Sequence, residues 1–531
     1  MRDALRVIAA LIAIWIAIFL VYRITERRLK IIDVQAVIRL PISLWNEGNL
    51  NVDEFTGIPQ GRGLTKEHDG HMVSVFPFWP SLQIFPVYAC YGAFGRMPTE
   101  ETVWTVQRRA SQVSMALTAT LIALLVAHRF NRQVAFLTAT AFAFGTINWF
   151  VLSQLAFSNG LVQLWVAGAL VVGVWRLPPS PRAATFSLML LVVATFFRLN
   201  LIVFALAWAT YLVLRLQRHS LWPLASALAL ALTMAAANTA YMGHPLGLYA
   251  IQASKLGLLS PSFWTALYGN LLSPARGLLV FSPWLIFGGL AFIARNREER
   301  LAFTAILAGC VAHYLLTCNY PRWQGGGSMG PRLTADLLPA WSLLAASGFA
   351  WCFQRRWLTG VAVALVGFSC IIAGGHAFSN SHLWEHVPVT TDIAPDRLFD
   401  WRDALVLEPF RRSSHEDRYP IHLLEPGPDS TVATPTLRLS WAPGASPGLT
   451  PEVDLSFRHR PRGVRIGLVT LAAVADDHLL VDAAALPSTF DPTRPVAWRV
   501  RLVDERGNTR SQSGWRQLRW CPPPVTAPEK P

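Results

Sequence analysis

Charged residues are scarce in this chain of 531 residues, and their scarcity argues against an ordinary soluble protein. They make up 15% of the sequence, whereas soluble globular domains contain about 25%. Hydrophobic residues account for 53%. A chain so poor in charge and so rich in apolar side chains is expected to have lipid as its solvent over most of its length.

Three further features are missing. The six cysteines show neither a metal-ligand spacing nor a disulfide framework, so no zinc site and no disulfide-rich fold are expected. No internal repeat is visible, which argues against a transporter or flippase. The net charge is +14, but the arginines form short groups at the ends of apolar runs, so nucleic-acid binding is not expected.

Long apolar runs are present instead, and most have about the length that a membrane-spanning helix needs. The first continues into Arg23 and Arg27 without a small-residue cleavage pattern, so we interpret it as a retained helix and not as a signal peptide. The short runs beside Arg198 leave a range of about ten to twelve spans, with about eleven preferred. The runs cover approximately residues 4–22, 110–127, 134–152, 157–175, 183–198, 200–214, 221–241, 277–294, 301–318, 333–352 and 358–378.

Arginines in alternate short connections predict the orientation of these spans. With about eleven spans, pairs such as Arg129 and Arg132 fall on the same side as Arg6, and the positive-inside rule makes that side the cytoplasm. The cluster at 23–30 lies on the other side, but it begins a long loop, where the rule is weak. The N-terminus is then cytoplasmic. The first loop (23–109), the loop at 242–276 and the tail from 379 lie on the opposite, periplasmic or extracellular side.

The predicted organisation is an α-helical polytopic membrane domain (1–378), a linker (379–420) and a soluble domain (421–531). The soluble part has short β-type runs separated by turn signals, which is typical of an all-β antiparallel sandwich. Its stretch Trp498–Asp504, followed by Gly507-Asn508, resembles the late strands of fibronectin type III-like modules. The β-type runs are Thr436–Trp441, Val453–Arg458, Val464–Thr470, Val496–Val503 and Trp515–Trp520.

The first loop contains the acidic candidates for chemistry. Asp33 closely follows the first predicted span, where a carboxylate can act as a general base at the membrane surface. The structural alternative for such a lone Asp is a helix N-cap. Further loop candidates are Asp53, Glu54, Asp69 and His71. His68, Asp69 and His71 resemble a metal site only weakly, so a solvated loop is the preferred interpretation and no metal site is assigned.

Several stretches match a known family in their order along residues 1–410. After Asp33 come Ser43-Leu44 with Gly48 and Leu50, then Asp69-Gly70 with Ser74, Phe76 and Pro77, then Leu271–Pro283 (LLSPARGLLVFSP), Trp323–Arg332 (WQGGGSMGPR) and Arg397–Trp401 (RLFDW). Together they resemble the GT-C superfamily of bacterial membrane glycosyltransferases, including protein O-mannosyltransferases and lipid A aminoarabinose transferases. The chain departs from the family motifs at Val34, Phe78 and Trp79.

The resemblance implies a GT-C-like fold and sugar transfer from a polyprenyl-phosphate donor to a cell-envelope acceptor, which is a glycan, a lipid or a protein. It places the reaction at the outer face of the bacterial cytoplasmic membrane and makes Asp33 the base of an inverting transfer. No cofactor is required, and the sequence offers no convincing site for a divalent cation.

Guanidinium groups bind phosphate with two hydrogen bonds and stay charged, so arginines in these loops are candidates for the donor phosphate. The candidates are Arg276, Arg332, Arg322 and Arg198. Their plainer alternative is pairing with lipid headgroups, and Arg198 has the further alternative of capping two short helices at the outer surface. The rival function is a non-catalytic membrane scaffold whose β domain is an interaction module, which the three departures from the motifs favour.

Overall fold

The computed structural model describes residues 2–522 except 28, 30, 56–64, 100, 248–259, 292–295, 327–328, 380, 386–389, 393, 412–420, 422, 443–448, 459–465, 473–476, 483–485, 487–493 and 504–508. Most of the turn signals predicted for the β domain and the middle of the 242–276 loop lie outside this part. The chain divides into a helical unit (1–325 and 329–379) and a β unit (326–328 and 380–531), and each is described by itself.

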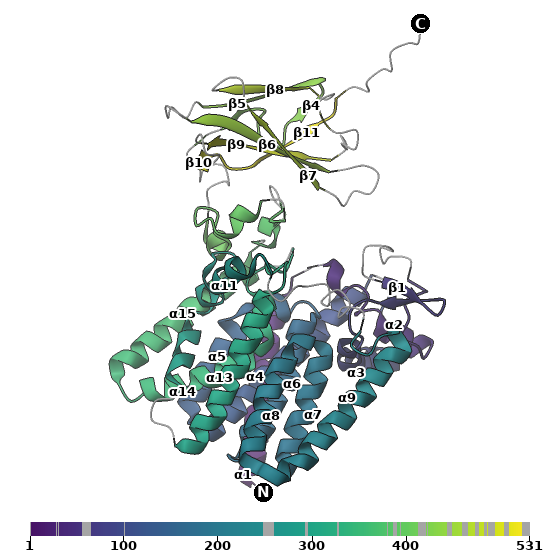
Figure 1. Cartoon of the computed structure of the whole chain (residues 1–531), viewed down its shortest axis with the longest axis vertical. Coiled ribbons are helices and arrows are strands. Elements are labelled where there is room, and N and C mark those ends of the chain that lie inside the picture. The colour runs from purple at the N-terminus through teal and green to yellow at the C-terminus, as the bar shows by residue number, and fades with distance from the viewer. Residues whose placement is uncertain are drawn as a thin grey trace. The chain divides into compact units, whose positions relative to one another are not determined.

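The helical unit is a bundle in which α4, α6, α7, α8, α9 and α13 run side by side (Figure 1). Neighbours in sequence pack as pairs, as in α6 against α7 and α4 against α5. The helices of this unit outside the first loop are α1 (Arg2–Ile24), α4 (Val103–Arg129), α5 (Arg132–Phe144), α6 (Ser158–Val174), α7 (Pro181–Phe197), α8 (Ile202–Leu216), α9 (Leu221–Met242), α11 (Phe263–Leu272), α12 (Leu278–Phe281), α13 (Arg297–Cys318), α14 (Leu338–Cys352) and α15 (Arg356–Phe378).

Within the described residues, six helical segments are long and apolar enough to cross a membrane. Large apolar side chains stand exposed on their outer faces, including Leu5 on α1, Leu232 on α9 and Ile371 on α15. Exposed leucine and isoleucine on so many helices are favourable only in contact with lipid, so the chain is a multi-pass membrane protein. The segments are Leu5–Ile24, Val103–Arg129, Leu199–Met242, Arg297–Cys318, Arg332–Cys352 and Arg356–Phe378.

Two of the predicted runs have irregular backbones. The run 134–152 is α5 followed by a π-helical turn at Asn148–Leu152. The run 277–294 becomes α12 and a 3-10 helix at Pro283–Leu290, because Pro283 lacks the N–H that would continue an α-helix. The apolar segment Leu199–Met242 contains two predicted runs, 200–214 and 221–241, and these form the separate helices α8 and α9 on either side of Gln217, whose φ is 49°. A total of about eleven crossings therefore stays a prediction.

The first loop folds as a small layer of its own. It contains a 3-10 turn at Ile32–Val34, α2 (Leu40–Asn46), the antiparallel hairpin β1 (Thr65–His68) and β2 (His71–Ser74), and α3 (Trp79–Ala93). Leu40, Val73 and Phe78 form its apolar core together with Met242 at the end of α9. The apolar helix α3 starts at Trp79, after β2 has ended at Ser74 and the chain has passed Pro77.

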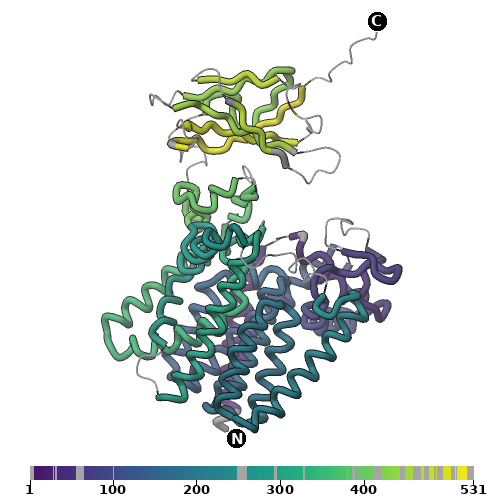
Figure 2. Tube along the Cα trace, in the orientation of Figure 1, coloured from purple at the N-terminus to yellow at the C-terminus, as the bar shows by residue number. Residues whose placement is uncertain are grey.

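The β unit is a sandwich of two sheets, seen as stacked layers in Figure 2. The larger sheet has the order β4-β11-β9-β6-β7, with β10 paired to β9, and the smaller has the order β3-β5-β8. The strands are β3 (Leu423–Glu425), β4 (Thr431–Val432), β5 (Thr436–Trp441), β6 (Thr450–Arg458), β7 (Ile466–Ala472), β8 (His478–Asp482), β9 (Val496–Val503), β10 (Thr509–Gln512) and β11 (Arg516–Trp520). A fibronectin type III-like assignment stays a prediction.

Alternating apolar residues fill the space between the two sheets. Leu437, Leu439 and Trp441 of β5 meet Val453 and Leu455 of β6 in one buried cluster, as the period of two along a strand requires. Trp441, Trp498, Trp515 and Trp520 are all buried. These tryptophans are therefore packing residues and do not form an exposed stacking surface for sugars.

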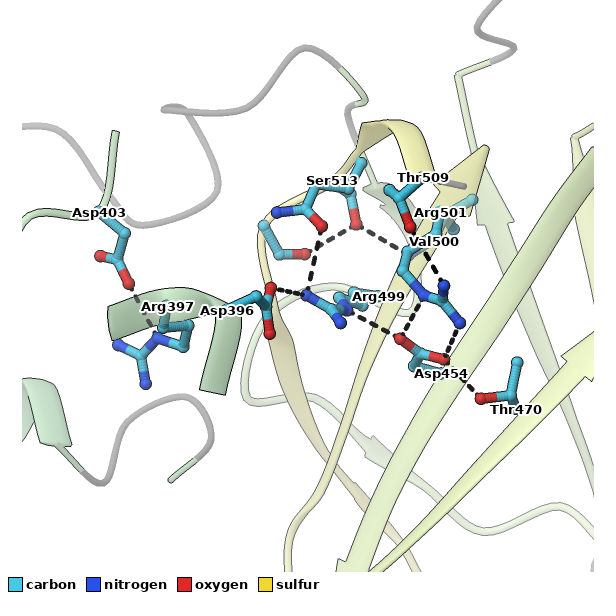
Figure 3. A network of polar contacts seen from close by, with 12 residues as sticks. Asp396, Arg397, Asp403, Asp454, Thr470, Arg499, Val500, Arg501, Thr509 and Ser513 are labelled. Carbon is cyan, nitrogen blue, oxygen red and sulfur yellow. Dashed lines mark hydrogen bonds and ion pairs between the residues drawn. The ribbon is translucent and has the colours of Figure 1, made fainter. Parts of the chain in front are cut away.

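The outer face of the larger sheet has a buried charge network at its centre (Figure 3). Asp454 of β6 accepts hydrogen bonds from Arg499 Nε at 2.9 Å and from Arg501 Nε at 2.7 Å. Arg499 also donates to Asp396 at 2.6 Å and lies over the ring of Trp515. Asp396 belongs to the 3-10 helix Pro395–Leu398, so part of the predicted linker packs on the sheet.

We predict that Asp454→Asn lowers the stability of the β unit by about 2 kcal/mol at pH 7, because it replaces the carboxylate between Arg499 and Arg501 with a neutral amide. Asp396 and Glu452 still pair with the two arginines. Burial raises the pKa of Asp454, but Arg501 and Arg499 outweigh it and hold that pKa below its usual range. The wild-type contribution is thus fully present above about pH 4, the unfolded value. It is lost as the pH falls through the lower folded value.

The measurement is protease protection of the β unit in the full-length protein during thermal unfolding, at a series of pH values. Asp454→Asn should flatten the loss of stability in acid. Glu425→Gln, a change at an exposed residue of β3, is the control and should leave the profile unchanged. An unchanged acid profile in Asp454→Asn would contradict the role of this network.

Candidate functional site

Asp33 and Arg332 form an ion pair across 299 positions of sequence. The Arg332 Nη1 to Asp33 Oδ2 distance is 3.2 Å. The Asp33 side chain is 45% exposed, whereas that of Arg332 is 9% exposed. Asp33 lies in the 3-10 turn that follows α1 in space and sequence, and Arg332 begins the 3-10 helix Arg332–Leu337 before α14. A carboxylate open to the surroundings thus contacts a buried cation.

The guanidinium of Arg332 is fixed on two further sides. Its Nη2 donates to the carbonyl of Gly325 at 2.6 Å, and its Cζ lies 4.4 Å from the ring centroid of Phe157. Gly325 and Gly330 have φ values of 78° and 63°, which L side chains adopt only with strain. The glycines therefore allow the turn that brings a backbone carbonyl back onto Arg332.

Arg276 is fixed by the neighbouring motif. Ser273 Oγ accepts hydrogen bonds from the backbone N–H groups of Ala275 and Arg276, both at 3.1 Å, and this turn directs the chain after α11. The side chain of Arg276 is buried, and its Nε donates to the carbonyl of Gln324 at 2.7 Å. The two long motifs recognised in the sequence are therefore in direct contact.

Arg198 lies at the break between α7 and α8, with extended backbone angles (φ −148°, ψ 102°). Its Nε contacts Asp336 Oδ2 at 3.3 Å. The positive charges of Arg198 and Arg276 both act on Arg332, so the three arginines are electrostatic neighbours. Asp33 and Asp336 offset part of their mutual repulsion.

The remaining candidates do not join this cluster. Arg322 is exposed, and it takes part in no ion pair between described residues. Glu54 accepts from Ser43 Oγ at 2.5 Å, within the first loop. Asp69 is exposed in the β1–β2 turn with φ 51°. No hydrogen bond or ion pair between described residues links these side chains to Asp33 or Arg332.

Asp53 and His71 pair with each other at the hairpin. Asp53 Oδ2 lies 2.7 Å from His71 Nδ1, and its Oδ1 accepts from the N–H of Met72 at 2.5 Å. Burial raises the pKa of Asp53, but the Met72 and His71 contacts outweigh it, so the net pKa is lowered. Among described residues, no group of three or more His, Cys, Asp or Glu side chains is placed to hold a metal ion.

Sequence reasoning missed the buried polar residues behind the arginines. Asp336 is fully buried and is surrounded by Asn159, Arg198, Asn200 and His313. Asp336 and His313 lie inside predicted spans (333–352 and 301–318), and an ionisable side chain at membrane depth is itself a functional signal. That signal was available in the sequence and could have found both residues.

Comparison with known proteins gives structural neighbours only. No family model and no curated protein sequence matches the chain. ArnT from Cupriavidus metallidurans in the apo state is 15% identical, with a TM-score of 0.44, over 72% of this chain and 65% of that protein. The Archaeoglobus fulgidus oligosaccharyltransferase, in a complex with Zn and sulfate, is 11% identical, with a TM-score of 0.36, over 76% of this chain and 60% of that protein.

Both neighbours belong to the GT-C superfamily, which the sequence motifs resemble. The chain spans less than two thirds of the length of either neighbour.

We predict that Gly269→Ala destabilises the helical unit by about 1–3 kcal/mol, the usual cost of overpacking. A Cβ at Gly269 of α11 would overlap the ring of Trp323, which is buried beside Gln324, the partner of Arg276. The measurement is the thermal unfolding midpoint of the purified protein in detergent.

Gly367→Ala is the matched control, because a Cβ at Gly367 of α15 meets nothing within 4 Å. We expect this variant to be at least as stable as the wild type, since alanine favours a helix over glycine. Equal midpoints for the two variants would show that Trp323 does not need the space at Gly269.

Proposed function

We propose that this protein is a membrane glycosyltransferase that moves a sugar from a polyprenyl-phosphate donor to a cell-envelope acceptor. The observation that carries the proposal is the pairing of the half-exposed Asp33 with the buried Arg332, beside Arg198 and Arg276. A base next to a cluster of guanidinium groups has the two functions that this transfer needs. One group accepts a proton, and the others bind phosphate.

In the proposed reaction, Asp33 takes the proton of an acceptor hydroxyl as its oxygen attacks the anomeric carbon of the sugar. The new oxygen–carbon bond forms while the bond from that carbon to the donor phosphate oxygen breaks. The electron pair of the broken bond stays on the lipid phosphate, and the anomeric carbon is inverted. Arg332 and its neighbours stabilise the charge that grows on the phosphate.

The ion pair also implies an order of events. Arg332 donates a hydrogen bond to Asp33 Oδ2 in the resting protein, so this oxygen is directed at the guanidinium and not at an acceptor hydroxyl. The donor phosphate is a diester with one negative charge, and it can bind a guanidinium through two oxygens as a carboxylate does. Arg198 and Arg276 beside Arg332 add to its attraction. The donor phosphate would therefore replace Asp33 at Arg332, and the exposed carboxylate would turn toward the acceptor. Donor binding thus precedes activation of the base.

We place the reaction at the outer face of the bacterial cytoplasmic membrane, with the N-terminus cytoplasmic and the β unit periplasmic or extracellular. The distribution of arginine among the short connections supports this orientation. The donor lipid would lie among the apolar helices, and the acceptor would approach from the aqueous side, where Asp33 is exposed. No metal is required for this chemistry.

The rival is a non-catalytic membrane scaffold, and it rests on Val34, Phe78 and Trp79, where the motifs of the family are not followed. Val34 and Phe78 are buried, and Phe78 belongs to the apolar core of the first loop with Trp79 packed against it. Their apolar character therefore has a packing role here. Loss of catalysis is not needed to account for it.

We predict that Asp33→Asn lowers transfer by at least about 100-fold, because the amide cannot accept the proton. The same change should not weaken binding of the donor phosphate, because it removes a competing carboxylate from Arg332. The assay is mass spectrometry of cell-envelope glycans and lipids in cells that lack the protein and in cells complemented with each variant.

Glu47→Gln, which changes an exposed carboxylate of the same loop, is the control and should restore the wild-type pattern. Wild-type transfer by Asp33→Asn would refute the assignment of the base. An envelope that is identical with and without the protein would refute the transferase and support the scaffold.

A further inference from the structure

The arginine cluster is backed by a second carboxylate, which is fully buried. Asp336 lies four residues after Arg332, on the same 3-10 helix. Its Oδ1 accepts from Asn159 Nδ2 at 2.7 Å. Its Oδ2 lies 3.2 Å from both Asn200 Nδ2 and His313 Nε2, and 3.3 Å from Arg198 Nε. The side chain of Asp336 is 0% exposed.

These contacts gather three separate segments around one side chain. Asn159 lies in the first turn of α6, Asn200 lies in the 3-10 turn Leu199–Leu201 next to Arg198, and His313 is in the second half of α13. An ionised carboxylate in a membrane-spanning unit is stable only with a cation and with its oxygens hydrogen-bonded. Arg198 supplies the cation, and the amide and imidazole groups hold the carboxylate in one place.

The side chain of Arg198 depends on Asp336 for its orientation, because Arg198 lies at the end of α7 and outside regular helix. It caps α7 in an extended conformation, where a long side chain has many available rotamers. The contact from its Nε to Asp336 fixes one edge of the planar guanidinium. This orientation is important because a guanidinium binds phosphate through two hydrogen bonds of defined geometry. Its charge then acts on Arg332 from a defined position.

The two carboxylates of the cluster differ in exposure, and this difference separates their roles. Asp33 is 45% exposed and has one hydrogen-bonding partner among the described residues, so it can leave its arginine. Asp336 is fully buried and has four partners. Its movement would leave buried donors without a hydrogen-bond acceptor, which is costly. The movable carboxylate suits chemistry, and the fixed one suits positioning.

We infer that Asp336 is a positioning residue that orients Arg198, and through Arg198 the phosphate of a lipid-linked donor. This inference rests on the proposed function for the identity of the ligand. Asp336 does not touch the donor or acceptor, and its effect passes through the guanidinium of Arg198.

The experiment is a binding titration of the full-length protein in detergent with farnesyl phosphate, and with uncharged farnesol as the control ligand. We expect Asp336→Asn to weaken farnesyl phosphate binding about 10-fold, as expected for one misplaced charge-assisted contact, and to leave farnesol binding unchanged. Arg198→Gln should weaken it similarly. In the double variant, Asp336→Asn should raise the dissociation constant for farnesyl phosphate by less than about threefold over that of Arg198→Gln alone. The reason is that both changes act on the same contact.

Two further variants separate positioning from general stability. Glu299→Gln breaks the Arg129–Glu299 ion pair of the same unit. Glu299 lies about 21 Å along α13 from His313, at 1.5 Å per residue, so its change should leave phosphate binding unaltered. Asn200→Ala removes one hydrogen-bond donor to Asp336 without removing a charge. It should weaken farnesyl phosphate binding severalfold, so the inference can be tested even where Asp336→Asn fails to fold.

The outcomes distinguish this inference from the function on which it rests. Wild-type protein that binds farnesyl phosphate no better than farnesol overturns the proposed donor site itself. A second outcome is that the wild-type protein prefers the phosphate and that Asp336→Asn and Asn200→Ala bind farnesyl phosphate as tightly as the wild type does. This outcome overturns only the positioning role. Fully multiplicative effects of Asp336→Asn and Arg198→Gln also overturn it, because the two residues would then act independently.

Discussion

The ion pair between Arg332 and Asp33 is the constraint on which the rest of the site depends. A guanidinium that is nearly withdrawn from solvent inside a membrane unit must be compensated, and Arg332 has the added repulsion of Arg198 and Arg276. Asp33 supplies the charge and the Gly325 carbonyl supplies a further hydrogen bond. The connection after α1 and the turn before α14 must therefore meet, although they are 299 positions apart.

This requirement explains why the two long motifs have their composition. Ser273 closes the turn that presents Arg276, and Arg276 reaches the carbonyl of Gln324. Trp323 packs where Gly269 has no side chain, and Gly330 provides the positive φ that returns the chain to Arg332. Serine, glycine and tryptophan thus build one scaffold, and the arginines are the groups that it holds.

The sequence predicted those parts of the structure that are encoded locally. Apolar runs of about 20 residues located the helices, and alternation located the strands of the β unit, because each pattern follows from the period of its own element. Asp33 and Arg332 were selected through motif resemblance. That they contact one another could not be derived, since nothing in a single sequence measures a distance across 299 positions.

Other features were beyond local reasoning for the same reason. Arg397, in the stretch after the last predicted span, is buried and pairs with Asp403 at 2.8 Å within the β unit, so it has a structural partner that its motif did not reveal. Asp336 was hidden inside an apolar run. Its four partners come from segments that meet only in the folded bundle, and Arg198 is 138 positions away in the sequence.

The departures from the family motifs affect the mechanism more than the fold. Val34, the departure that follows Asp33 directly, is 2% exposed, and a carboxylate at this position would be buried. Asp33 is thus the one carboxylate of its 3-10 turn, and Arg332 occupies its Oδ2. A base held in this way gains from a ligand that takes over the arginine. In the proposed reaction the donor phosphate is such a ligand, so the substrate itself would complete the activation of Asp33.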